Sequence, residues 1–98
     1  MLNSIAYNNA YSIIEIALEE LNDWSMEEYG VWSQTPYYLQ DIVDILKEKS
    51  KNATLGNDNT IIVNGVVVYM WSNGYENKEK TYGVWNPIPY DELNDEYK

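Results

Sequence analysis

The sequence predicts a single small α+β domain in which two helices precede a three-stranded antiparallel β-meander. Apolar residues recur at helical spacing in the first half of the chain, and an Asn-Gly pair at 64–65 joins two β-branched runs. A chain of 98 residues with 45% apolar content suits one core. We divide this domain into a helical acidic half (1–51), a β half (59–90) and an acidic tail (91–98).

Residues from Ser4 to about Trp24 are expected to form the first helix. Its apolar residues share one broad face, namely Ala6, Ala10, Ile13, Ile14, Ala17, Leu18 and Leu21. Glu15 and Glu19 lie on the other side, one turn apart, and Glu20 borders the apolar face. The following stretch, 25–34, mixes acids with aromatics and is expected to be irregular.

Thr35-Pro36 predicts the start of a second helix, because the hydroxyl can cap free amides and proline is tolerated in the first turn. This helix is expected to bury Leu39, Ile42, Val43 and Leu46 and to point Asp41, Asp44 and Glu48 outward. Three lysines (Lys47, Lys49 and Lys51) follow at the negative end of the helix dipole. Residues 52–59 are expected to form a polar loop.

The Asn64-Gly65 pair predicts a two-residue hairpin between 60–63 and 66–71. Pairing across it places Ile61, Val63, Val66, Val68 and Met70 on one face, and Thr60, Ile62, Val67, Tyr69 and Trp71 on the other. Both faces are apolar, so the two helices can cover only one of them. Residues 81–85 can supply a third strand, which the prolines of 86–89 end, and the tail is a short helix or frays.

A phrase of aromatic residues occurs twice. Tyr-Gly-Val-Trp stands at 29–32 and at 82–85, each time after a Trp-Ser pair and before a Pro-Tyr pair, and the two copies contain all four tryptophans. One interpretation is a pair of aromatic corners packed on the core. The other is a small-molecule or peptide binding module built from Tyr29, Trp32, Trp71, Tyr82 and Trp85.

The residue types argue against an enzyme. The chain has no His, Cys or Arg, so the usual base and nucleophile near neutral pH are missing. Asp41, Asp44 and Glu48 could hold a divalent cation loosely, but a solvated polar face explains them as well and is the favoured interpretation. No cofactor or metal is therefore expected.

The charge distribution bounds the kind of partner. The first 46 residues contain eight acids and no lysine, whereas the rest balances eight acids against six lysines. Such a surface repels nucleic acid and anionic membranes and attracts basic proteins. The sequence lacks a secretion signal and a membrane span, so a cytoplasmic protein is expected.

The arginine-free stretch from Glu15 to Asp44, the short length and the bias to Asn, Tyr, Ile and Lys carry a resemblance. In composition the chain resembles the small acidic inhibitors that phages and mobile elements make against host nucleases, including anti-CRISPR proteins and other DNA mimics. The resemblance covers composition alone and implies no correspondence between residues. It implies action in the cytoplasm of a host cell.

We therefore expect a non-enzymatic inhibitor that occupies the basic nucleic-acid-binding surface of a host protein, such as a CRISPR effector or another nuclease. The residues expected to bind this partner are Glu15, Glu19, Asp23, Glu27, Glu28, Tyr29, Trp32, Asp41 and Asp44. Two alternatives stay open: the aromatic binding module, and a homodimer of an assembly or immunity type that closes on its spare sheet face.

Overall fold

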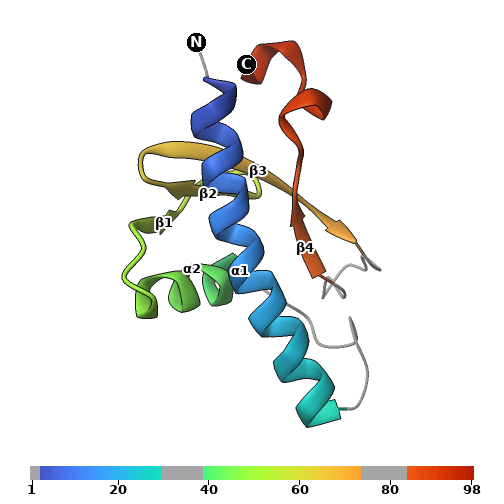
Figure 1. Ribbon diagram of the computed structural model, residues 1–98. Coiled ribbons are helices and arrows are strands. Elements are labelled where there is room, and N and C mark those ends of the chain that lie inside the picture. Colours follow the sequence, from blue (N-terminus) through green and yellow to red (C-terminus); the bar gives the residue numbers. More distant parts are fainter. Residues whose placement is uncertain (1–2, 30–38, 74–83) are drawn as a thin grey trace.

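The computed structural model describes residues 3–29, 39–73 and 84–98 and shows the α+β class that the sequence predicts. Helices α1 (Ser4–Tyr29) and α2 (Leu39–Glu48) precede four strands, β1 (Ala53–Leu55), β2 (Thr60–Val63), β3 (Val66–Asn73) and β4 (Val84–Pro87). The strands form one antiparallel sheet in the order β1-β2-β3-β4. Two short 3-10 turns, η1 (Tyr90–Glu92) and η2 (Asp95–Tyr97), follow β4 (Figure 1).

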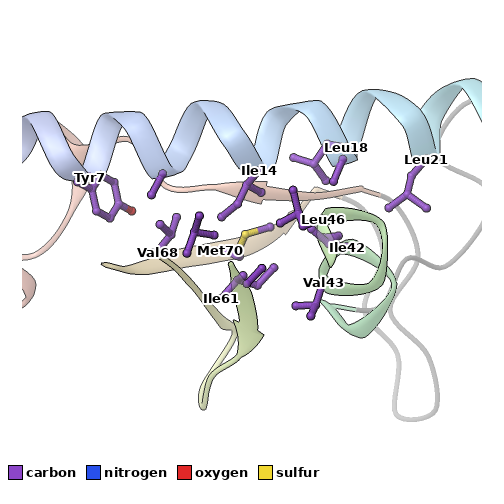
Figure 2. Close-up of a cluster of buried hydrophobic side chains, with 14 of the residues drawn as sticks. Tyr7, Ile14, Leu18, Leu21, Ile42, Val43, Leu46, Ile61, Val68 and Met70 are labelled. Carbon is purple, nitrogen blue, oxygen red and sulfur yellow. The ribbon is translucent and has the colours of Figure 1, made fainter. Parts of the chain in front are cut away.

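One hydrophobic core joins these elements. Helix α1 contacts β3 and β4, and α2 contacts β1 and the side of α1. The buried face of α1 consists of Tyr7, Ala10, Ile14, Ala17, Leu18 and Leu21, whose spacing is that of one helix face. Figure 2 shows Tyr7, Ile14, Leu18 and Leu21 on the side of α1 that faces Val68 and Met70 of β3 and Ile42 and Leu46 of α2.

Helix α1 is longer than the sequence predicts. The carbonyl group of the Asn3 side chain caps its start and accepts hydrogen bonds from the amides of Ile5 (2.8 Å) and Ala6 (3.3 Å). The helix then continues through Trp24 to Tyr29, so the expectation of irregular structure was wrong for residues 25–29. Neither proline nor glycine interrupts the chain before Gly30, and residues 26–28 are good helix formers.

In α2, Ile42, Val43 and Leu46 are buried as predicted, whereas Leu39 is only half-buried. The predicted start of this helix at Thr35-Pro36 lies outside the described residues.

The predicted loop at 52–59 contains a strand that the sequence did not suggest. Ala53 is buried and pairs with Val63, and Leu55 pairs with Ile61, so β1 adds a fourth strand at the edge of the sheet. Its turn to β2 requires Gly56, because a Cβ there would collide with the Thr60 hydroxyl, which donates a hydrogen bond to the Asn57 carbonyl. Three residues with two exposed side chains gave too little pattern for a strand prediction.

The predicted hairpin is confirmed. Val63 pairs with Val66 across Asn64 and Gly65, whose φ angles are 51° and 80°. The predicted inner face is the core face, since Ile61, Val63, Val68 and Met70 are buried. On the other face Val67 and Trp71 are exposed, while Thr60 at its margin is buried.

The structure describes the last strand at Val84–Pro87, two residues beyond the predicted end at 85, and residues 81–83 of the prediction lie outside the described residues. Pro87 is the last residue of β4, in agreement with the prediction that the prolines of 86–89 end the strand, and it pairs with Met70 of β3. The Met70 amide donates to the Asn59 carbonyl on the β2 side (2.9 Å). Because the amide and carbonyl of one strand residue point to the same side, Met70 presents neither group to Pro87. A proline on an edge strand is tolerated in such a position.

Just beyond Pro87, the hydroxyl of Tyr7 is inserted between β3 and the chain that leaves β4. The Ile88 amide donates to the Tyr69 carbonyl (2.7 Å), but the return bond is missing. Instead the Tyr7 hydroxyl donates to the Ile88 carbonyl (2.6 Å) and accepts from the Tyr69 amide (3.4 Å). Burial raises the pKa of Tyr7 to about 12. This contact fixes where the tail leaves the sheet.

The tail folds back over the molecule beside the first turns of α1 (Figure 1). The Tyr90 ring lies 5.8 Å from the Tyr7 ring, measured between centroids, and Leu93 is buried. The Tyr97 ring stacks on Tyr69 at a centroid distance of 4.1 Å. The tail therefore packs as two 3-10 turns. Of the two outcomes that the sequence left open, a short helix or a frayed end, the structure shows the helical one.

Candidate functional site

Four of the predicted contact residues form a stripe on α1, which we call the acidic ridge: Glu15, Glu19, Asp23 and Glu27. They are spaced four residues apart, and each is exposed. Because one turn takes 3.6 residues, such a stripe winds only slowly around the helix. The ridge lies on the side of α1 opposite its buried face, so the carboxylates point into solvent.

The ridge is regular along the helix axis. Four residues of α-helix rise about 6 Å, so the acidic ridge spans about 18 Å. Each strand of duplex DNA carries a phosphate about every 3.4 Å along the axis. The carboxylates of the ridge therefore follow one another at somewhat less than twice the spacing of phosphates.

An exposed isoleucine stands within this charged surface. Ile16 is 44% exposed, beside Glu15 and about one turn from Glu19 and Glu20. Ile5, on the first turns of the same helix, is 71% exposed. Sequence reasoning missed both residues because it grouped only the apolar side chains that fit the buried face. For Ile16 the sequence did contain a signal, since an isoleucine on the same side of a helix as glutamates is directed away from the core.

One acid of α1 is paired internally. Glu20 forms an ion pair with Lys49, which lies just after α2, at 3.3 Å between carboxylate oxygen and ammonium nitrogen. Both side chains are more than 40% exposed, so water and salt screen this pair. Glu20 thus joins the two helices and leaves the four residues of the acidic ridge outside the pair.

The acids Asp41 and Asp44 belong to α2, a separate helix packed against α1 (Figure 1). Asp44 is exposed and accepts a hydrogen bond from the Gln40 side-chain amide at 2.8 Å. Asp41 is half-buried. The side chains of Glu28 and Tyr29, and the whole of Trp32, lie outside the described part of the structure. Their predicted role in binding stays a prediction, as it does for the other six.

A second exposed surface lies on the side of the sheet that the helices leave uncovered. We call it the outer sheet face, and it consists of Ile62, Val67, Tyr69 and Trp71 of the strands together with Tyr97 of η2. Val67, Trp71 and Tyr97 are each exposed by a third or more of their surface. Of the two copies of the aromatic phrase, Trp24 and Trp71 are exposed, and most of the remainder lies outside the described residues.

Over the described ranges, no three Asp or Glu side chains gather closely enough to hold a metal ion. Within the same ranges, neither helix is long and apolar enough to cross a membrane. No protein-family model matches the chain, and no similar curated protein or solved structure was found.

Proposed function

We propose that this protein is a non-enzymatic inhibitor that binds the basic nucleic-acid-binding surface of a host protein through the acidic ridge of α1. The observation that carries the proposal is the alignment of four exposed acidic residues along the outer side of one continuous helix. Opposite charge steers a basic partner toward this face and speeds association. A groove that normally holds a phosphate backbone has the complementary charge.

The exposed Ile16 can supply apolar binding energy, which the charges of the acidic ridge alone do not provide. Binding energy in protein interfaces comes mainly from a few side chains that are buried at the centre of the contact. Ile16 follows Glu15 in the chain and lies about one turn from Glu19, so a partner that pairs with these two acids of the ridge would also cover it. The arrangement is an apolar centre with a charged rim, the usual anatomy of an interface.

The kind of partner follows from the residue types that the chain lacks and from the net charge that it carries. Without His, Cys or Arg it has few means of catalysis, and its net charge of −10 opposes direct binding to nucleic acid. A basic nuclease, a CRISPR effector or another DNA-acting enzyme fits this surface. In that role the protein acts against a defence system in the cytoplasm of a host cell and needs no cofactor.

The test is capture of host proteins from a nuclease-treated bacterial lysate on the immobilised protein, eluted with rising salt. The ridge variant carries Glu15→Gln, Glu19→Gln and Asp23→Asn, whose side chains are all exposed, so the fold is kept. We expect the ridge variant to bind the captured protein with about tenfold lower affinity and to release it at lower salt. The reason is that three charge pairs are lost, each of which contributes a few tenths to one kcal/mol.

A control variant separates the placement of charge from its total. Glu48→Gln, Asp91→Asn and Asp95→Asn remove the same number of charges from exposed positions outside the acidic ridge. This variant should bind within about threefold of the original protein. Equal losses in both variants would show that net charge, and not the ridge, attracts the partner, and would end the proposal.

The outer sheet face supports a second candidate, an aromatic-lined module that binds a peptide or small molecule. Trp71 and Tyr97 are both 39% exposed on this face, although aromatic side chains of this size are usually buried in the core. The same face could instead close on a second copy of the chain. Sedimentation detects that dimer directly, and binding that does not weaken with salt would favour the module over the acidic inhibitor.

A further inference from the structure

A pocket opens where the tail meets β3. Its volume is about 350 Å³, which is within the range of sites for small ligands. It is lined by Trp71, Ile88, Glu92, Leu93, Asn94 and Tyr97. The pocket therefore combines one residue of the sheet with five residues of the segment that follows β4.

Two aromatic side chains form walls of this pocket. Trp71 projects from β3 on the outer sheet face, and Tyr97 comes from η2. The Tyr97 ring lies against the Tyr69 ring, 4.1 Å away between centroids, with the two ring planes inclined by 30°. The buried Leu93, only 5% exposed, anchors the chain between the two turns. The walls are thus fixed while part of each ring stays open to a ligand.

The charges around the pocket are negative. Glu92 is one of the lining residues, and Asp91, Asp95 and Glu96 lie on the same two turns. The charge of Glu96 is the main cause that raises the pKa of the Tyr97 hydroxyl. The one lysine of the tail, Lys98, is placed over the Tyr90 ring, with its ammonium nitrogen 5.3 Å from the ring centroid.

We propose that the pocket between Trp71 and Tyr97 binds a cationic side chain, lysine or arginine, presented by another protein. Aromatic faces attract ammonium and guanidinium groups, and Glu92 supplies the opposite charge at the same place. The contact between Lys98 and Tyr90 shows the same chemistry within the tail. The pocket and the acidic ridge are built from different elements, so the pocket can bind a cation whether or not the ridge binds a partner.

The test is a titration followed by the NMR signal of the Trp71 indole N–H, which the Trp71→Phe variant identifies. The probes are the N-acetyl amides of arginine and lysine, each compared with a neutral isostere, citrulline for arginine and norleucine for lysine. We expect millimolar binding of the cations that is about 2- to 30-fold tighter than that of their isosteres, the range given by cation–π and carboxylate contacts. Equal affinity for arginine and citrulline, or no shift at millimolar concentrations, would overturn the proposal.

Two variants locate the charge. Glu92→Gln should weaken arginine binding about threefold or more, whereas Asp91→Asn, an exposed neighbour outside the lining, should leave it within about twofold. Similar losses in both would mean that the field of the whole tail, and not the pocket, holds the cation. The ridge variant should bind arginine as well as the original protein does, so failure here is distinguishable from failure of the proposed function.

Discussion

Tyr7 is the residue on which the join between helix, sheet and tail depends. Its hydroxyl bonds to both Ile88 and Tyr69, at the point where the two strands would otherwise bond directly to each other. No sequence pattern predicts that Tyr7 connects these elements, because in the sequence it only occupies an apolar position of α1. The residue was not among the apolar positions expected to face the core, yet it is fully buried.

We expect Tyr7→Phe to lower the free energy of unfolding by about 1–3 kcal/mol, because a buried amide and a buried carbonyl lose their partner together. Urea denaturation measures this change. Tyr11→Phe, one turn later on the same helix and only half-buried, is the control and should have a smaller effect. An unchanged stability of Tyr7→Phe would mean that β3 and the tail simply close on each other.

The same hydroxyl makes stability sensitive to alkaline pH. The pKa of Tyr7 is about 12 in the folded protein, against the ordinary value of 10.0. The unfolded chain therefore loses this proton first, so the stabilisation is complete below pH 10 and declines as the pH rises toward 12. We expect a loss of about 2 kcal/mol over this interval, measured by urea denaturation at each pH. The decline should be shallower in Tyr7→Phe, and an identical decline would assign it to other groups.

At the scale of elements, long patterned segments were predictable and short ones were not. The apolar face of α1 and the Asn64-Gly65 hairpin each follow from spacing and turn chemistry, and both are found as expected. β1 has only three residues, and it is a strand because it pairs with β2. The local sequence pattern does not reveal this contact. The extension of α1 to Tyr29 was missed because aromatics and acids were taken to break a helix that contains no breaker.

Helix α2 ends in a conformation that its sequence does not favour. Ser50 has a φ of 60°, the Lys51 amide donates to the Leu46 carbonyl (2.9 Å) and the Ser50 amide to Lys47 (3.0 Å). This is a Schellman motif, in which glycine is the usual residue at the left-handed position.

Replacing Ser50 by glycine should therefore stabilise the protein by about 0.5–1 kcal/mol, because the strain of the left-handed backbone is relieved. Thermal and urea denaturation would both show it. Ser12→Gly in the middle of α1 is the opposite control and should destabilise. A loss of stability in Ser50→Gly would contradict this account of the helix end.

The whole molecule has two unlike surfaces. α1 carries the acidic ridge on its outer side, whereas the outer sheet face and the tail carry exposed aromatic and aliphatic side chains. The imbalance of charge could be read from the sequence, since eight acids precede the first lysine. That Glu20 is paired with Lys49 could not, because this contact depends on how the helices pack.

A net charge of −10 on so small a domain also sets its response to salt. Like charges repel, and the screening length falls from about 30 Å at 0.01 M to about 8 Å at 0.15 M ionic strength. We therefore expect the melting temperature to rise with sodium chloride over this interval. The ridge variant, with three fewer negative charges, should show a smaller rise. A melting temperature that falls with salt would indicate that attractive pairs dominate.

Competition with DNA tests the central claim most directly. The captured host protein is given a fluorescent DNA duplex, and the unlabelled acidic protein is added while fluorescence anisotropy reports the bound DNA. We predict that the protein displaces the duplex, that the ridge variant needs about tenfold higher concentration, and that the control variant does not. A complex that holds both the duplex and the protein at once, or equal displacement by all three proteins, would contradict the claim that the acidic ridge occupies a nucleic-acid site.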